Sequence, residues 1–246
     1  MSGEVTRKRR VLITGGGSGI GRGLAQAFAD AGDEVTITGR GLDALQETDG
    51  GRGMTCRTAD VTDEAQVAAL FDAPFDVVIA NAGGGAAGKL RSISLEQWNQ
   101  TLAVNLTGTF LTFREALKVM QPGGRMIAIA STASLKGGAT IAAYAAAKHG
   151  VLGLVRSIAQ EVATKGMTCN AICPGFVDTP LGQAAVDAVQ KRFSLTPEEA
   201  LAQIVADNPM KRMVRVDEVT AAALFLASPG ASMVNGHALS VSGGEI

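Results

Sequence analysis

The feature that most constrains the fold is a glycine-rich turn between a short apolar run and an amphipathic segment. Residues 11–13 are apolar, Thr14 through Gly21 contain five glycines, and helical periodicity begins at Gly19. Glycines let a backbone turn sharply and leave open space beside it. The free N–H groups at the start of the next helix face that space and can bind an anion such as a phosphate. The sequence therefore predicts a strand–turn–helix unit that can hold a phosphate.

Short apolar runs alternate with helix-length segments along the rest of the chain. Continuous apolar runs are typical of strands buried on both faces, and alternation of strand and helix implies a parallel sheet. The expected strands are residues 10–14, 34–39, 54–58, 75–80, 125–130, 168–173 and 238–241. The expected helices are residues 19–31, 42–48, 64–71, 95–120, 141–165, 197–207 and 217–227. We predict an α/β chain, a single-domain doubly wound Rossmann fold whose seven-stranded parallel sheet has helices on both faces.

The predicted domain covers residues 1–246, with one long insertion at about 175–213. In doubly wound folds, ligands bind at the carboxyl ends of the strands. The insertion follows such an end, so we expect it to form a small substrate lobe of two short helices.

Composition excludes several other classes of protein. The net charge is −1, which favours neither nucleic acid nor a membrane surface as a partner. No apolar run approaches ~18 residues, so we expect no membrane span. The three cysteines, Cys56, Cys169 and Cys173, are too few for a disulfide framework and favour a reducing, cytoplasmic compartment. Cys169 and Cys173 lack a second Cys or His pair nearby, so we expect no metal.

The end of the second predicted strand indicates which dinucleotide the turn binds. The turn has the spacing G-x-x-x-G-x-G, which is neither the common G-x-G-x-x-G fingerprint nor a Walker loop. Dinucleotide folds usually place an acidic residue about 20 residues further on, for the ribose 2′-hydroxyl. Here Arg40 follows the strand instead, and a guanidinium can pair with a 2′-phosphate. NADP(H) is therefore favoured over NAD(H); the alternative is a solvated loop arginine.

A tyrosine and a lysine provide the candidate chemistry. Tyr144 and Lys148 are four residues apart, so they share one face of a helix, and Ser131 follows a predicted strand upstream. An ammonium at ~4 Å and an effective dielectric of ~20 contributes about 4 kcal/mol. That would lower the pKa of a tyrosine from about 10 to about 7. Tyr144 then exchanges a proton with a carbonyl or alcohol oxygen that Ser131 holds, although a lone tyrosine is more often core.

Together these motifs resemble the classical short-chain dehydrogenase/reductase family, from about residue 9 to the end of the chain. The resemblance implies hydride transfer between NAD(P) and a ketone or secondary alcohol. It implies a catalytic set of Asn105, Ser131, Tyr144 and Lys148, in which Lys148 also binds the nicotinamide ribose and Asn105 holds a water that relays protons. Asn105 can equally be an ordinary polar helix residue. The implied cofactor contacts are Gly15, Ser18, Gly19, Ile20, Gly21, Arg40, Asp60, Val61, Asn81, Ala82, Gly83, Tyr144, Lys148, Pro174, Gly175, Val177 and Thr179.

The substrate and the assembly are less constrained. The last twelve residues look like those of 3-oxoacyl thioester reductases and 3-hydroxyacyl dehydrogenases, so such a thioester is the first hypothesis. Sugars and other secondary alcohols remain open, as does a non-catalytic NADP-binding regulator on the same fold. The resemblance also implies a homotetramer. His149 and His237 are interpreted as packing residues.

Overall fold

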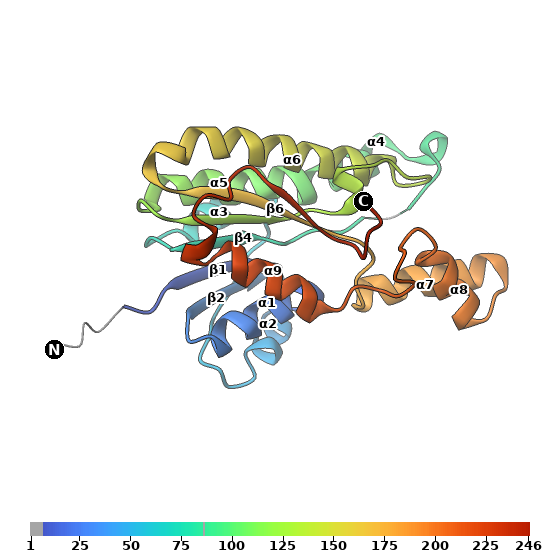
Figure 1. Ribbon diagram of the computed structural model, residues 1–246, viewed down its shortest axis with the longest axis horizontal. Coiled ribbons are helices and arrows are strands. Elements are labelled where there is room, and N and C mark those ends of the chain that lie inside the picture. The colour runs from blue at the N-terminus through green and yellow to red at the C-terminus, as the bar shows by residue number, and fades with distance from the viewer. Residues whose placement is uncertain (1–6, 86) are drawn as a thin grey trace.

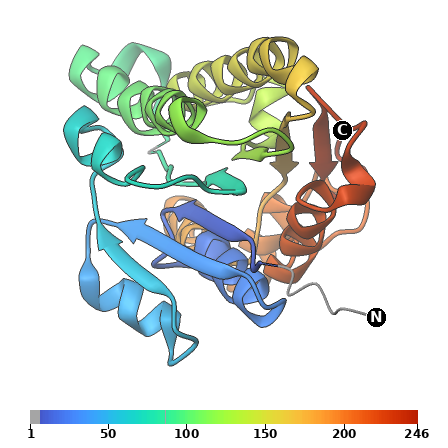
Figure 2. The same cartoon turned by 90° about the vertical axis from the view of Figure 1, so that its left-hand side faces the viewer.

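The computed structural model describes residues 7–85 and 87–246, which form one seven-stranded parallel sheet between two layers of helices (Figures 1 and 2). The predicted fold class is confirmed. The sheet has the order β3-β2-β1-β4-β5-β6-β7. Strands β1 to β3 are added toward one edge of the sheet and β4 to β7 toward the other, so the order of strands reverses between β1 and β4. The strands are β1 Arg10–Thr14, β2 Glu34–Gly39, β3 Thr55–Thr58, β4 Val77–Ala80, β5 Arg125–Ile129, β6 Thr168–Pro174 and β7 Ala238–Val241.

The helices divide between the two faces of the sheet (Figure 1). Helices α1, α2 and α9 cover one face, and α3, α5 and α6 cover the other. The helices are α1 Gly19–Asp30, α2 Leu42–Asp49, α3 Glu64–Ala69, α4 Leu95–Leu102, α5 Gly108–Val119, α6 Ala142–Val162, α7 Pro180–Phe193, α8 Pro197–Ile204 and α9 Val216–Leu226.

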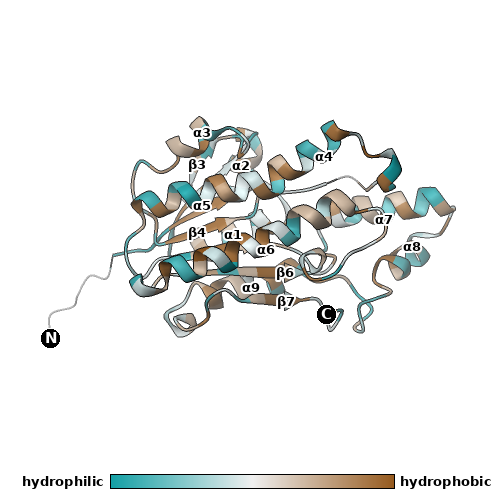
Figure 3. Cartoon of the chain, turned by 90° about the horizontal axis from the view of Figure 1, so that it is seen from above, coloured by the Kyte–Doolittle hydropathy of each residue, from teal (hydrophilic) through white to brown (hydrophobic). Residues whose placement is uncertain are grey.

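Continuous apolar strands are required because both faces of the sheet are buried. In β1, Leu12 belongs to the core beneath α5 and α6, whereas its neighbour Ile13 belongs to the core beneath α1 and α9. Ile13 is in register with Ile37 on one side and Ile79 on the other. Figure 3 shows the same arrangement, with strands that are mostly apolar and helices that carry both polar and apolar residues. No helix within residues 7–85 and 87–246 is long and apolar enough to cross a membrane.

The helix predicted over residues 95–120 is present as one helical run from Leu95 to Val119, but its geometry is not α-helical throughout. A π-helical segment, Ala103–Thr107, separates α4 from α5. The Asn105 side chain donates to the Thr101 carbonyl at 2.9 Å, and the Thr109 hydroxyl donates to the Asn105 carbonyl at 2.8 Å. Single π-helical turns are frequent at functional sites, and this one places Asn105 in the interior.

The segment 175–213 holds α7 and α8 and extends away from the sheet (Figure 1). It packs around a small core of its own, formed by Val186, Ala200, Val205 and Met213. Helix α8 begins with a capping box between Thr196 and Glu199. With fourteen residues, α7 is longer than the short helix expected there.

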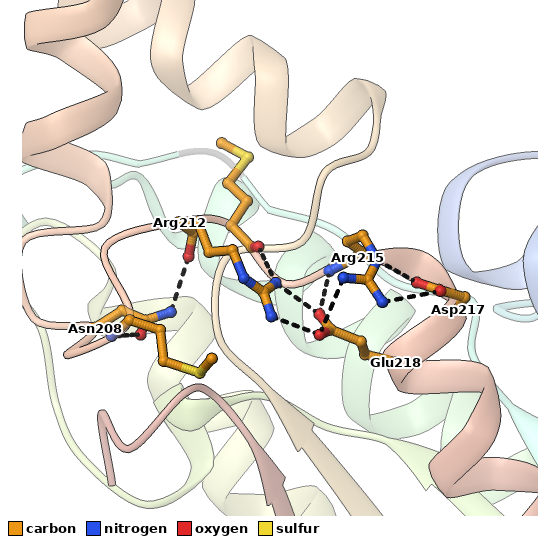
Figure 4. Close-up of polar contacts among 7 residues, drawn as sticks. Asn208, Arg212, Arg215, Asp217 and Glu218 are labelled. Atoms are coloured by element: carbon orange, nitrogen blue, oxygen red, sulfur yellow. Dashed lines mark hydrogen bonds and ion pairs between the residues drawn. The ribbon is translucent and has the colours of Figure 1, made fainter.

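Residues 208–218 connect this lobe to α9, and we call this connection the neck. Figure 4 shows its polar contacts. Val177 forms an isolated parallel bridge with Val214. Arg212 binds Glu218 through two nitrogens at 2.6 and 2.8 Å, and this pairing lowers the pKa of Glu218 to about 2. The Asn208 amide donates to the Arg212 carbonyl at 2.9 Å. The neck is therefore held by the Asn208 side chain at its start and by the Arg212–Glu218 pair at its end.

Candidate active site

A cleft of about 690 Å³ opens at the carboxyl ends of the central strands, beside the reversal between β1 and β4. This is where a doubly wound sheet binds its ligand. The cleft is lined by fourteen of the predicted cofactor contacts: Gly15, Ser18, Gly19, Ile20, Gly21, Arg40, Asp60, Val61, Asn81, Ala82, Gly83, Tyr144, Lys148 and Thr179.

The glycine turn forms a cradle that side chains would fill. Gly15 and Gly19 have φ angles of +68° and +51°, a region that favours glycine. A Cβ at Gly21 would overlap the Gly15 carbonyl oxygen and the Asn81 amide. The turn can therefore follow this tight path only because these positions carry no side chain. It leads into the N-terminus of α1 at the cleft, and the residues present fit the pyrophosphate of a dinucleotide.

Asn81 ties this turn to the neighbouring strand. Its amide nitrogen donates to the Thr14 carbonyl at 2.9 Å and to the Gly15 carbonyl at 3.2 Å. The Thr14 hydroxyl accepts from the backbone N–H groups of Asn81 and Ala82, both at 3.0 Å. The two strand ends are thus locked together beneath the cleft.

Arg40 and Asp60 follow the carboxyl ends of the neighbouring strands β2 and β3, and both line the cleft. The Asp60 carboxylate accepts from the Thr62 N–H at 2.9 Å and from its hydroxyl at 2.7 Å, and these bonds, with Arg40 nearby, lower the pKa of Asp60. Arg40 is exposed and makes no side-chain hydrogen bond or ion pair within the described part of the chain. Its guanidinium is available to an anion.

Tyr144 and Lys148 lie on the first two turns of α6 and face the cleft. The Lys148 ammonium is buried, donates to the Ile129 carbonyl at 2.8 Å, and lies 5.6 Å from the centre of the Tyr144 ring. Ser131 does not line the cleft; its hydroxyl accepts from the Ala133 N–H at 3.1 Å, and its side chain also meets the Tyr144 hydroxyl. The predicted serine, tyrosine and lysine are therefore close neighbours.

The prediction that Lys148 lowers the pKa of Tyr144 is wrong. With the residues of this chain alone, the pKa of Tyr144 is raised above its ordinary value. Burial raises the pKa of Tyr144, and the hydrogen bond with Ser131 only partly opposes it. Burial also lowers the pKa of Lys148 to about 8. The lysine points to a backbone carbonyl rather than to the phenol oxygen, so desolvation exceeds the attraction that the sequence argument assumed.

Asn105 is buried behind the cleft and binds the backbone of the Asn81–Gly85 loop. Its amide nitrogen donates to the Gly84 carbonyl at 2.6 Å, and its oxygen accepts from the Gly84 N–H at 3.1 Å. Gly85 lies beyond, where a Cβ would be 3.2 Å from the Tyr144 ring. Asn105 thus holds the loop that packs against Tyr144.

Three predicted cofactor contacts do not line the cleft. Pro174 is the buried end of β6, Gly175 donates to the Val241 carbonyl at 3.1 Å, and Val177 is paired with Val214 in the neck. Thr179 does reach the cleft, because its methyl lies 3.4 Å from the position of a Cβ on Gly19.

Fifteen further residues line the cleft that were not predicted from the sequence. Most are small or apolar residues beside the predicted ones. Gln100 comes from the end of α4, and Ala103 and Val104 come from the π-helical segment. The additional residues are Gly17, Gly39, Gly41, Ala44, Leu45, Ala59, Thr62, Gly84, Gln100, Ala103, Val104, Ile129, Ala130, Pro180 and Leu181. Only their position directly after a strand could have identified some of them.

The other candidates lie elsewhere. His149 is exposed, and its Nδ1 lies 2.9 Å from the Ala145 carbonyl. Cys169 and Cys173 are buried free thiols of β6. Within residues 7–85 and 87–246, no three His, Cys, Asp or Glu side chains are grouped to hold a metal.

A doubly wound sheet whose phosphate cradle, tyrosine and buried lysine share one cleft defines a dinucleotide-dependent oxidoreductase. Residues 15–245 match a family model described as enoyl-(acyl carrier protein) reductase. The chain belongs to the classical short-chain dehydrogenase/reductase family, as its sequence predicted.

Relatives of this family match nearly the whole chain. A putative ketoacyl reductase of Streptomyces coelicolor is 35% identical over 95% of both chains. A D-beta-hydroxybutyrate dehydrogenase of Rhizobium meliloti is 34% identical over 96% of this chain and 98% of its own. The crystal structure of an actinorhodin polyketide ketoreductase with NADPH has a TM-score of 0.89, 34% identity and 97% coverage of both chains. The chain is an NAD(P)-dependent oxidoreductase that acts on a ketone or secondary alcohol, as predicted.

Proposed function

We propose that this enzyme reduces a ketone to a secondary alcohol with Tyr144 as the proton donor. The observation that carries the proposal is that Tyr144 and Lys148 line the same cleft as the phosphate cradle, with Ser131 beside the phenol. The cradle from Gly15 to Gly21 holds the pyrophosphate. When bound, the reduced nicotinamide supplies the hydride.

The side chains of the site divide the remaining work. Ser131 donates a hydrogen bond to the carbonyl oxygen and so sets its orientation. Tyr144 gives its proton to that oxygen as charge develops. Lys148 stabilises the phenolate that results and binds ribose hydroxyls with the N–H groups not used by Ile129. Asn105 holds the Gly84 backbone in place. It thereby also fixes the position of the water that relays protons near Lys148.

We propose a 3-oxoacyl thioester as the substrate, held by the lobe 175–213. The relatives named ketoacyl reductase, 3-oxoacyl-[acyl-carrier-protein] reductase and D-beta-hydroxybutyrate dehydrogenase support this class. The lobe presents exposed apolar side chains, Phe176, Leu181 and Phe193, and Leu181 lines the cleft. A cyclic ketone is the second candidate, because a levodione reductase and a cis-4-hydroxycyclohexanecarboxylate dehydrogenase are 35% and 36% identical.

The substrate class is tested by following absorbance at 340 nm with NADPH or NADH. The panel contains a 3-oxoacyl thioester, a 2-enoyl thioester, a cyclic diketone and a simple secondary alcohol for the reverse direction. We expect the highest kcat/KM with the oxoacyl thioester. Higher kcat/KM with the cyclic diketone selects the second candidate, and reduction of the enoyl thioester alone contradicts carbonyl chemistry.

We propose NADP(H) rather than NAD(H) as the cofactor. Within the described residues the Arg40 guanidinium has no partner and can bind a 2′-phosphate, while the nearby Asp60 carboxylate is occupied by the Thr62 N–H and hydroxyl. A hydrogen bond to a charged group contributes about 1.5–3 kcal/mol, so Arg40→Ala should raise the Kd of NADPH about 10- to 100-fold and barely change that of NADH.

Titration of the dinucleotides by fluorescence checks this expectation. Arg52→Ala is the matched control, because Arg52 is paired with Asp30 and lies outside the cleft lining. Equal losses for NADPH and NADH in the Arg40 variant would show that Arg40 does not recognise the 2′-phosphate.

We further propose a homotetramer in the cytoplasm. Exposed Leu95 and Phe110 on α4 and α5 give these helices an apolar surface suited to another copy of the chain, as the family resemblance implies. The free thiols of Cys56, Cys169 and Cys173 suit a reducing compartment.

A further inference from the structure

A buried carboxylate near the end of the chain lies beside the active site without lining the cleft. The Glu245 side chain is only 10% exposed. Its Oε1 lies 3.0 Å from Lys136 Nζ, and its Oε2 lies 2.9 Å from the position that a Cβ on Gly175 would take. Glu245 thus fills the space between the turn after β6 and Lys136.

Lys136 is mechanically coupled to Ser131. The two residues belong to one tight turn after β5, in which the Lys136 N–H donates to the Thr132 carbonyl at 3.0 Å and the Ser134 N–H donates to the Ser131 carbonyl at 2.9 Å. Because these bonds leave little backbone freedom, a contact that fixes Lys136 also helps to fix the segment that begins at Ser131.

The tail that carries Glu245 is itself fixed. Gly243 and Gly244 have φ angles of +64° and +89°, and a Cβ on Gly243 would overlap the Asn208 amide of the lobe neck. The Gly175 N–H donates to the Val241 carbonyl at 3.1 Å, which attaches the tail to the end of β6. Glu245 therefore pairs with Lys136 from a defined position.

The two carboxylates on Lys136 differ in their surroundings. Asp207 also lies 3.0 Å from Lys136 Nζ, but its side chain is 78% exposed. Exposed ion pairs contribute little, whereas a buried charge that loses its partner destabilises its neighbourhood. Lys136 is itself 38% exposed, so the two pairs differ in how enclosed the carboxylate is, and Glu245 is the partner with less freedom to move.

We propose that Glu245 and Lys136 are positioning residues, which hold the Ser131 turn against Gly175 so that Ser131 stays aligned with Tyr144. This inference rests on the proposed roles of Ser131 and Tyr144. It assigns a function to two residues that are not part of the cleft lining.

The test measures kcat, KM, dinucleotide Kd and Tm of the full-length protein with its best carbonyl substrate. Since small misplacements of catalytic groups slow a reaction strongly, Glu245→Gln should lower kcat about tenfold, with dinucleotide Kd changed less than about twofold. Lys136→Met should give the same loss, and the double variant no greater loss. Lys136→Arg should restore most of kcat. Asp72→Asn, the matched control, should retain it, because Asp72 is an exposed partner of Arg57 outside the lobe and the cleft lining.

Assays are run well below the Tm of each variant, so that loss of folded protein does not count as loss of kcat. The proposal is overturned if Glu245→Gln lowers Tm but not kcat, if the losses multiply in the double variant, or if Asp72→Asn loses as much. A Tyr144→Phe control separates the two levels. If that variant keeps its turnover, the proposed chemistry fails; if it loses turnover while Glu245→Gln does not, only the positioning inference fails.

Discussion

Replacing Tyr144 with Phe is expected to lower kcat about 10³-fold, within the range that general acid catalysis contributes. Phe keeps the ring that packs near Gly85 and removes only the hydroxyl beside Ser131. The fold and the cradle should be unaffected, because the hydroxyl bonds to the Ser131 side chain at the site and not to the glycine turn. The change is measured as NADPH oxidation at saturating substrate, together with the dinucleotide Kd and the Tm.

The burial of the phenol makes this prediction sharp. Because desolvation raises the pKa of Tyr144, the hydroxyl is protonated at neutral pH and ready to act as a donor in reduction. The matched control is Phe225→Leu, an exposed aromatic change on α9 outside the cleft lining, which should leave the proton step intact. Retention of most of the turnover by Tyr144→Phe would assign the proton to another group and remove the basis of the proposed mechanism.

Replacing Gly21 with Ala is expected to weaken dinucleotide binding at least tenfold and to destabilise the fold by about 1–3 kcal/mol, as overpacking does. The added Cβ would overlap the Gly15 carbonyl oxygen and the Asn81 amide, so the turn must move. Both atoms belong to the bonds that join β1 to the loop after β4. Dinucleotide titration and thermal unfolding give the two effects separately.

Gly153→Ala is the matched control for this change. Gly153 also lies within a helix, but a Cβ there meets nothing within 4 Å. Alanine is the better helix former, so the control should leave Tm unchanged or slightly higher. If Gly21→Ala bound the dinucleotide as tightly as the unaltered chain, the turn would not be the phosphate cradle.

The fold and most of the cleft could be predicted from the sequence because they depend on local patterns. Leu12 and Ile13 face opposite cores, so a strand of this sheet must be apolar throughout, and the glycine turn admits few backbone paths. Residues directly after a strand meet at one edge of the sheet. This rule placed Arg40 in the cleft, and the family resemblance added Asp60 and Asn81, which also follow strands.

The remaining features depend on contacts between distant segments. The π-helical segment at Ala103–Thr107 is linked to Asn105, whose side chain binds Thr101 and Gly84, and helical periodicity does not reveal that pairing. The direction of the Tyr144 pKa depends on how deeply α6 is buried. The Lys136–Glu245 pair joins positions more than a hundred residues apart, so neither residue stood out in the sequence.

The separate core of α7 and α8 has a consequence for how this scaffold can diversify. Because the lobe packs on itself and meets α9 through the Arg212–Glu218 neck, its outer residues can be exchanged without repacking the sheet. Grafting the corresponding segment from a related reductase, with the neck retained, should therefore transplant substrate preference while the hydride chemistry of the host persists.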